Sequence, residues 1–151
     1  MRTGVRLAVD VGAVRIGVAR SDASGTLAVP EVTLDARKDW LADLVGLVAE
    51  WEPLEIVVGL PLSLDGSERE AASRVRSVVA QIRAELPTIP LRLVDERFST
   101  TVATSRMREA GIATREGRRF VDQAAAVMIL QQTLDTERSS GQAPGELANG
   151  S

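Results

Sequence analysis

Short apolar runs alternate along this chain with longer segments in which apolar residues recur every three or four positions. The first run breaks at Gly12 and apolar character then resumes, a pattern that predicts a β-hairpin. The run Ile56–Gly59 has no polar side chain and is typical of a strand buried on both faces of a parallel sheet. The five expected strands cover 5–11, 16–19, 27–34, 56–59 and 91–95.

Three longer segments have the spacing of amphipathic helices. The first stops before Pro53, and the second starts with the S-x-x-E capping box Ser67–Glu70 and stops at Pro87. Ser99 or Thr100 can cap a shorter helix that runs through 109. The expected long helices cover 37–51, 67–86 and about 117–136.

This order of elements predicts one α/β domain over residues 1–136. Three strands joined by tight turns, followed by alternating helices and strands, imply a mixed sheet with helices on both faces. Residues 137–151 are mostly Ser, Gly, Ala, Pro and Asn with little to bury, so we expect a disordered tail there.

Composition narrows the location and the chemistry. With 44% hydrophobic residues the 151-residue chain is long enough for one packed core. No apolar run approaches the roughly 18 residues of a membrane span, and the N-terminus does not resemble a secretion signal, so we expect a cytoplasmic protein without a membrane partner. The chain has no Cys and no His. Thiolate zinc sites, cysteine nucleophiles and histidine bases are therefore excluded, and carboxylates, hydroxyls, Arg, Lys or a metal must act instead.

The net charge of −3 is unevenly distributed. Six arginines and two glutamates lie between Arg97 and Arg119, whereas six acidic and two basic residues lie between Asp35 and Glu55. We therefore expect a basic side and an acidic side, of which only the basic one suits a polyanion.

Carboxylates occupy three apolar stretches where an uncompensated charge would be costly. Asp10 follows Leu7–Val9 in the first strand, the pair Asp95 and Glu96 closes the fifth strand, and Asp122 lies near the start of the last helix. Ends of central strands are where sites form in such sheets. Convergence of these carboxylates on a divalent cation would compensate all of them.

Each carboxylate also has a simpler interpretation. Asp10 could be a turn residue in the hairpin, and Asp122 could be a charge that the helix dipole stabilises by about 0.3–1 kcal/mol. Asp95 and Glu96 point to opposite faces of a strand, so only one of them can face Asp10.

Four motifs together resemble the YqgF/RuvX family, in the right order and over nearly the whole chain from Leu7 to Leu134. At the motif positions the chain matches the family, although Phe98 and Ser99 stand where the family often has Leu or Thr. The motifs are Asp10–Ala19 (DVGAVRIGVA), Gly59–Pro61 (GLP), Asp95–Thr100 (DERFST) and Asp122–Gln131 (DQAAAVMILQ).

The resemblance implies a ribonuclease H-like fold, a mixed five-stranded sheet flanked by helices, and a metal-dependent nuclease activity. It implies a role in processing the 5′ end of precursor 16S ribosomal RNA, and an older description of the family is Holliday junction resolvase. It selects Asp10, Glu96 and Asp122 as the catalytic residues and metal ligands. All-oxygen ligands favour one or two Mg²⁺ or Mn²⁺ ions over Zn²⁺.

Basic and hydroxyl side chains near these motifs are the expected nucleic-acid contacts, because phosphate charge dominates nucleic-acid affinity. The alternatives are a solvated arginine face, a surface position for Arg15, and helix capping by the hydroxyls. The expected contacts are Arg15, Arg97, Ser99, Thr100, Arg106, Arg118 and Arg119.

The substrate and the assembly stay open at this point. Precursor rRNA and a four-way DNA junction both present phosphates, and a binding module without turnover is a further alternative. A junction resolvase calls for a homodimer, whereas an RNA-processing enzyme can act as a monomer.

Overall fold

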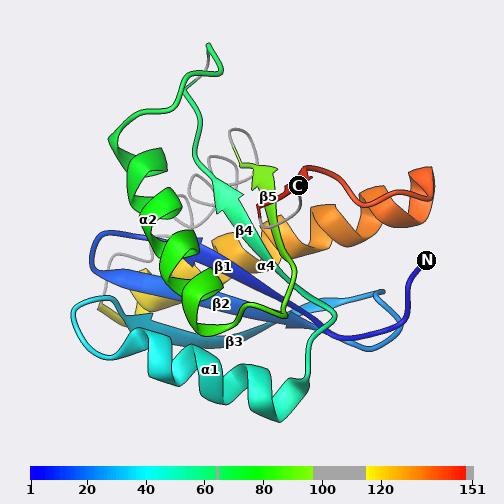
Figure 1. Ribbon diagram of the computed structural model, residues 1–151, viewed down its shortest axis with the longest axis horizontal. Coiled ribbons are helices and arrows are strands. Elements are labelled where there is room, and N and C mark those ends of the chain that lie inside the picture. Colours follow the sequence, from blue (N-terminus) through cyan, green and yellow to red (C-terminus); the bar gives the residue numbers. More distant parts are fainter. Residues whose placement is uncertain (64, 97–114, 149–151) are drawn as a thin grey trace.

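The computed structural model describes residues 1–63, 65–96 and 115–148, and only the backbone of 115–122. In this part of the chain a six-stranded sheet has the order β3-β2-β1-β4-β5-β6. The helices are α1 (Trp40–Trp51), α2 (Glu70–Glu85) and α4 (Arg115–Ser140) (Figure 1). The strands are β1 (Arg6–Val11), β2 (Arg15–Ser21), β3 (Ala28–Asp35), β4 (Glu55–Leu60), β5 (Leu91–Asp95) and β6 (Glu146–Leu147).

The sheet is mixed, as predicted. β1, β2 and β3 form an antiparallel meander, β1, β4 and β5 run parallel, and β6 returns antiparallel to β5. The five predicted strands are all present and β6 is an addition. Parallel β1, β4 and β5 end at the same edge of the sheet, which is where Asp10 and Glu96 lie.

The pleat of the central strands separates two buried layers. Leu7, Val9, Ile56 and Val58 belong to the core under α1 and α2, whereas Ala8 and Val57 pack against α4. In Figure 1, α1 and α2 lie in front of the sheet and α4 lies behind it. Ala125 and Ala126 are buried on α4, and such small side chains allow a helix to approach a sheet closely. A polar side chain two positions from Ala8 along β1 therefore also faces α4.

The first two helices begin three residues later than predicted, at Trp40 and at Glu70. At α1 the Asp39 carboxylate caps the helix by accepting from the Ala42 N–H at 3.3 Å. The capping box predicted at Ser67 is wrong, because α2 begins only at Glu70 and the Ser67 hydroxyl donates to Asp65 at 2.6 Å. The side chain of Ser67 closes a local loop instead of a helix end.

The C-terminal segment is more ordered than its composition suggests. α4 continues to Ser140, with Glu137 buried, so the predicted start of a disordered tail at 137 is too early. Residues 141–148, which we call the C-terminal strap, run along β5; β6 forms part of this strap, and the Ala148 N–H donates to the Leu91 carbonyl at 2.7 Å. Gly145 brings the strap close, because a Cβ there would lie 2.0 Å from the Leu93 carbonyl oxygen.

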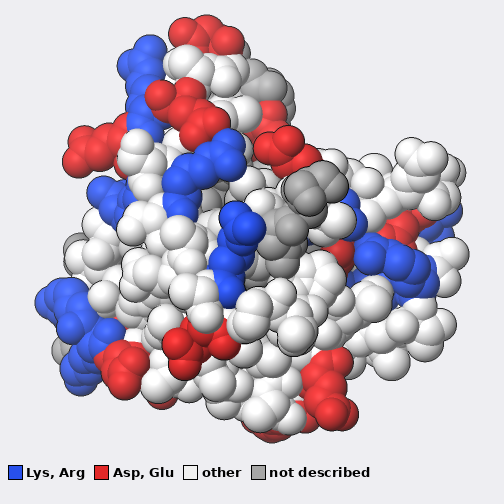
Figure 2. Space-filling model, viewed as in Figure 1, with Lys and Arg blue, Asp and Glu red and all other residues white. Residues whose placement is uncertain are grey.

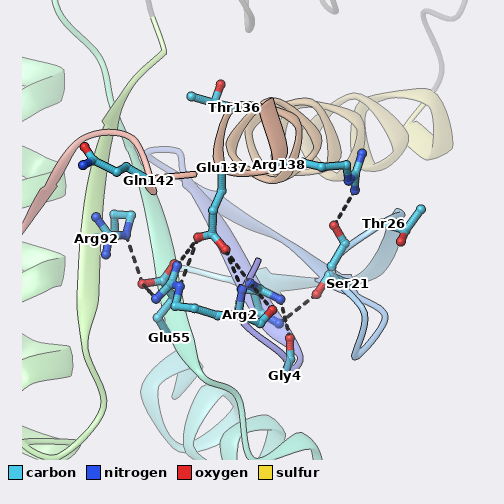
Figure 3. Close-up of polar contacts among 12 residues, drawn as sticks. Arg2, Gly4, Ser21, Thr26, Glu55, Arg92, Thr136, Glu137, Arg138 and Gln142 are labelled. Atoms are coloured by element: carbon cyan, nitrogen blue, oxygen red, sulfur yellow. Dashed lines mark hydrogen bonds and ion pairs between the residues drawn. The ribbon is translucent and has the colours of Figure 1, made fainter. Parts of the chain in front are cut away.

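A cluster of arginines and glutamates, in which Arg2 is exposed and Arg6, Glu55 and Glu137 are buried, joins the chain's N-terminus to α4 and to the beginnings of β4 and β5 (Figure 3). Arg2 lies between Glu55 and Glu137, with its Nη2 2.9 Å from Glu55 Oε1 and a short contact to Glu137. Arg6 reaches Glu137 at 3.0 Å and Arg92 reaches Glu55 at 3.0 Å. We call these five side chains the arginine–glutamate cluster.

The cluster anchors the last turns of α4 through Glu137. Burial of Glu137 would raise the pKa of its carboxyl, but hydrogen bonds from Arg2 and the charges of Arg2 and Arg6 hold that pKa below its ordinary value. Glu137 is therefore ionised at neutral pH and holds the last turns of α4 on the sheet. No helix within the described ranges is both long and apolar enough to cross a membrane.

Candidate metal and nucleic-acid site

Asp10 lies at the carboxyl end of β1 and is half-buried. It pairs in register with Gly17 of β2. It is two positions from Ala8, which packs on the α4 side of the sheet. Its side chain therefore belongs to the face that α4 covers. Asp10 is an integral strand residue, which rules out the alternative of a turn position.

Glu96 follows β5 directly and is held by the sheet, since its N–H donates to the Leu60 carbonyl at 3.3 Å. Its side chain is only 7% exposed. A Cβ added to Gly59 of β4 would lie 2.4 Å from Glu96 Oε2 and 2.7 Å from Ile129 Cδ1 of α4. The Glu96 carboxylate thus occupies space that Gly59 leaves between β4 and α4.

The two neighbouring acids of β5 have different environments. Asp95 is exposed and pairs with Leu60 in the strand register, whereas Glu96 is buried beside Gly59 and Ile129. Glu96 is therefore the acid that shares the α4 side of the sheet with Asp10. β4 alone separates their two strands.

Asp122 lies in the first half of α4, and its side chain falls outside the described part of the structure. The next residue, Gln123, donates to the Thr33 hydroxyl at 2.9 Å. Thr33 pairs with Gly17, and Gly17 pairs with Asp10, so this turn of α4 crosses the sheet at the level of Asp10. Among the side chains that the structure describes, no three acidic groups gather as a ligand set, and the predicted triad stays a prediction.

The turn that joins β1 to β2 positions Arg15 beside this face. The Gly12 N–H donates to the Arg15 carbonyl at 2.9 Å, and a Cβ on Gly12 would lie 2.6 Å from that oxygen. Arg15 alternates with buried Ile16, whose side chain belongs to the opposite core, so Arg15 faces the α4 side. The tight turn therefore requires glycine and places Arg15 two positions from Gly17, the strand partner of Asp10.

Asp35 is a further acidic residue near this end of the sheet. Asp35 pairs with Arg15 in the strand register, and its carboxylate accepts from Arg37 Nε at 3.1 Å and from the Arg37 backbone N–H at 2.9 Å. These hydrogen bonds from Arg37 lower the pKa of Asp35 to about 2. Asp35 is thus ionised and paired outside the predicted triad.

Several predicted nucleic-acid contacts lie beyond what the structure describes. Arg97, Ser99, Thr100 and Arg106 fall in 97–114, together with the short helix expected there. Arg118 and Arg119 lie on α4, where the backbone alone is described. Their predicted contacts stay predictions.

Sequence reasoning missed the part that Gly59 plays. Glycine weakens a buried strand, and its presence in one often marks the close approach of another group. The run Ile56–Gly59 carried that signal, but the group that approaches, Glu96, is 37 positions further along the chain. Ile129 and Gln123 were likewise seen only as helix residues.

The family model described as "RuvX: Holliday junction resolvase" matches residues 4–136. This chain belongs to the RuvX family. RuvX relatives include a protein of Streptomyces coelicolor that is 51% identical over 148 residues, covering 97% of this chain and 89% of that protein. A Thermobifida fusca relative is 45% identical over 157 residues and covers 99% of both chains. Both carry the name "Putative pre-16S rRNA nuclease".

Solved structures confirm the predicted ribonuclease H-like fold. The chain is similar to T. thermophilus RuvC in complex with a Holliday junction substrate, with a TM-score of 0.64, 13% identity, and coverage of 95% of this chain and 99% of that one. A fowlpox virus resolvase in complex with Holliday junction DNA has a TM-score of 0.52 at 10% identity and covers 91% of this chain and 97% of that one. At such identities the likeness concerns the fold alone.

Proposed function

We propose that this RuvX protein is a metal-dependent endonuclease that hydrolyses phosphodiesters, with Asp10, Glu96 and Asp122 as its acidic residues. The observation that carries the proposal is the placement of Glu96. The side chain of Glu96 is only 7% exposed, and its carboxylate lies over Gly59 of β4. Asp10 lies on the same side of the sheet, on β1, which is the other neighbour of β4. If Asp122 joins Asp10 and Glu96 on this side of the sheet, the three carboxylates would repel one another without a cation.

The donor set fits a hard divalent cation. Asp10 and Glu96 offer carboxylate oxygens, and the chain has no Cys or His to supply the sulfur and nitrogen that Zn²⁺ prefers. The space above Gly59 that a Cβ would fill holds the Glu96 carboxylate at this edge. Asp10, Glu96 and Asp122 would hold Mg²⁺ or Mn²⁺, which supplies Lewis-acid activation of water and of the phosphate.

The remaining residues of the site bind and orient the substrate. Arg15 lies beside Asp10 and is suited to grip a phosphate of the cleaved strand, since a guanidinium can donate two parallel hydrogen bonds. Arg97, Ser99, Thr100, Arg106, Arg118 and Arg119 would extend this grip along the nucleic acid. The Leu60 carbonyl holds the backbone N–H of Glu96, and the Glu96 carboxylate fills the space above Gly59, so this carboxylate is oriented before substrate binds.

We propose the 5′ end of precursor 16S rRNA as the substrate. The names of the S. coelicolor and T. fusca relatives support this choice, because they are 45–51% identical over nearly the full chain. A branched DNA junction is the second candidate. The description of the family model favours it, as do the junction complexes among the structures of similar fold.

The test compares the wild type with Asp10→Asn on a precursor-rRNA fragment and on a four-way DNA junction, with Mg²⁺ or Mn²⁺. We expect cleavage by the wild type and a loss of at least about 100-fold in Asp10→Asn, since the substitution removes a charge that holds the cation. Asp43→Asn, an exposed change on α1, is the matched control and should cleave normally.

A second measurement does not depend on turnover. Mg²⁺ or Mn²⁺ should raise the Tm of the wild type and of Asp43→Asn, because a ligand of the folded state stabilises it, but not that of Asp10→Asn. Equal cleavage and equal Tm shifts in wild type and Asp10→Asn would reject the site. The more efficiently cleaved nucleic acid identifies the substrate.

A further inference from the structure

One flank of α4 carries polar side chains that bind β3, an edge strand of the sheet, and the loop before it. They stand at positions 123, 131 and 138, and steps of eight and seven residues are each about two turns of a helix. We call these three side chains the polar flank. Their hydrogen bonds run from Gln123 Nε2 to Thr33 Oγ1 at 2.9 Å, from the Ala28 N–H to Gln131 Oε1 at 2.9 Å, from Gln131 Nε2 to the Thr26 carbonyl at 3.0 Å, and from Arg138 Nη2 to the Gly25 carbonyl at 2.6 Å.

The other flank of α4 is held by apolar packing. Ile129 precedes Gln131 by two residues, which places it roughly on the opposite side of the helix. Its side chain is 2% exposed and reaches the space above Gly59, beside the Glu96 carboxylate. The helix is therefore fixed between a packing contact with β4 and hydrogen bonds to β3.

Apolar packing alone does not fix the height of the first half of α4 along the sheet. The three residues after Gln123 are Ala124, Ala125 and Ala126, and the last two are buried. Such short side chains form no long ridges that could interlock with the sheet, and apolar contacts have no preferred direction. A hydrogen bond demands a narrow range of distances and angles. The bond from Gln123 to Thr33 therefore specifies where this turn of the helix lies.

This turn lies at the level of Asp10. Thr33, Gly17 and Asp10 are direct partners in register across β3, β2 and β1, so they share one face of the sheet. The first and the last are two strand spacings apart, roughly 10 Å. Gly17, in the middle, adds no side chain to this row. The backbone of Asp122 directly precedes Gln123 on α4.

We propose that Gln123 is a positioning residue, whose hydrogen bond to Thr33 holds the turn of α4 that carries Asp122 at the level of Asp10 and so sets the affinity of the site for its divalent cation. In this role Gln123 acts through Asp122 and is not itself a ligand. The inference rests on the proposed nuclease function, to whose metal site it adds a residue. Such a site requires its ligands to be held within about 0.5 Å of their productive positions.

The test measures Mn²⁺ affinity by calorimetry without nucleic acid, and then kcat and KM on the substrate that is cleaved more efficiently. Gln123→Met keeps the length and the helix propensity of the side chain and removes its hydrogen bond. We expect the Kd for Mn²⁺ to rise about tenfold, as on loss of an orienting hydrogen bond near a metal site. At Mn²⁺ concentrations below the wild-type Kd, kcat should fall by a similar factor while KM for the nucleic acid stays unchanged.

Gln131→Met is the matched control on the same flank. It removes the two hydrogen bonds to Ala28 and Thr26, so it should lower the midpoint of denaturant unfolding at least as far as Gln123→Met does. Its Mn²⁺ affinity and kcat should nevertheless equal those of the wild type. An equal loss of Mn²⁺ affinity in both variants would make Gln123 a general stabiliser of the helix and would overturn the inference.

Substitutions of the bonding partner assign the effect to this hydrogen bond. Thr33→Ser keeps the hydroxyl and should keep the wild-type affinity for Mn²⁺. Thr33→Val removes the hydroxyl, and in its background Gln123→Met should change the Kd no further, because the bond has already been lost. If Gln123→Met still raises the Kd tenfold in the Thr33→Val background, the proposed route through Thr33 is wrong.

Asp10→Asn separates this inference from the proposed function. If the wild type binds Mn²⁺, Asp10→Asn does not, and Gln123→Met binds it as tightly as the wild type, the metal site stands and the positioning role of Gln123 fails. If the wild type neither binds Mn²⁺ nor cleaves nucleic acid, the nuclease proposal fails and the inference fails with it.

Discussion

At the scale of single residues, a missing side chain is as informative as the acids themselves. All residues of β4 are buried, and all except Glu55 are apolar. The space above Gly59 is filled by the Glu96 carboxylate. A larger residue at 59 would compete with both Glu96 and Ile129 for that space. We therefore regard Gly59 as a positioning residue that acts through Glu96.

Gly59→Ala should separate positioning from stability. Its Cβ would lie 2.4 Å from Glu96 Oε2 and 2.7 Å from Ile129 Cδ1, so we expect a loss of about 1–3 kcal/mol in the free energy of unfolding. Displacement of the carboxylate by about 1 Å should also lower kcat about 100-fold. Denaturant unfolding and cleavage kinetics measure the two effects.

A second substitution sharpens this prediction. Ile129→Val removes the Cδ1 that meets the new methyl group, so Gly59→Ala with Ile129→Val should regain stability but not activity. Gly46→Ala, in a helix position with nothing within 4 Å of the added Cβ, should cleave normally and gain up to about 1 kcal/mol. Full activity in Gly59→Ala would contradict the role of Gly59.

At the scale of elements, the two ends of α4 have different tasks. Its first half crosses the sheet at the level of Asp10, through the hydrogen bond from Gln123 to Thr33. Its last turns are held by Glu137 in the arginine–glutamate cluster, at the beginnings of β1 and β4 (Figure 3). The cluster is thus remote from the candidate site, and it keeps the helix in place along the sheet.

Glu137→Gln should destabilise the fold by about 3 kcal/mol at neutral pH, because it removes the carboxylate that pairs with the buried Arg6 side chain, whereas the exposed Arg2 keeps its pair with Glu55. The folded state lowers the pKa of Glu137, so its contribution is complete above the ordinary value of 4.5 and is lost as the pH falls through the folded-state pKa. The difference in Tm between wild type and Glu137→Gln should therefore narrow with acidification.

Glu68→Gln is the control for this pH series. Glu68 pairs with Arg76 at 2.8 Å, but both side chains are more than two-fifths exposed, so solvent screens the pair. Its removal should leave the Tm nearly unchanged at every pH. If the difference in Tm between wild type and Glu137→Gln stays constant from neutral to acidic pH, ionisation of Glu137 is not the source of the stabilisation.

At the scale of the whole molecule, charge is unevenly distributed over the surface. Separate acidic groups lie over α1 along the lower edge of the view in Figure 2, with basic groups at the left end, whereas acidic and basic groups are interspersed over α2. This agrees with the acidic balance between Asp35 and Glu55 in the sequence. We expect nucleic acid to approach from the side of α4 and the strand ends, away from α1.

The salt dependence of binding tests this orientation. Arg118→Ala with Arg119→Ala should weaken RNA binding and reduce the slope of log K against log salt by about 1.4, if each arginine neutralises one phosphate of a single strand. Arg74→Ala with Arg83→Ala removes two arginines from α2 and should leave the slope unchanged. Equal slopes in all three proteins would place the RNA on another surface.

The sequence by itself determined what depends on neighbours along the chain. Alternation of apolar residues, the glycine between β1 and β2, and the aliphatic run of β4 are local signals, and they predicted five strands, the hairpin and the helical layers. The acids at the ends of β1 and β5 were found in the same way, because strand ends can be located from the pattern.

Only the tertiary structure decided what depends on contacts between distant segments. The family resemblance selected Glu96 over Asp95, but its position on the α4 side was visible only from the register of β4 and β5 and the space above Gly59. The order of 137–148 needed Glu137 to meet Arg2 and Arg6, and β6 to meet β5, partners that lie far away in the sequence. Composition records how much a segment can bury, but a buried ion pair and a strand edge become available to it only once the rest of the chain has folded.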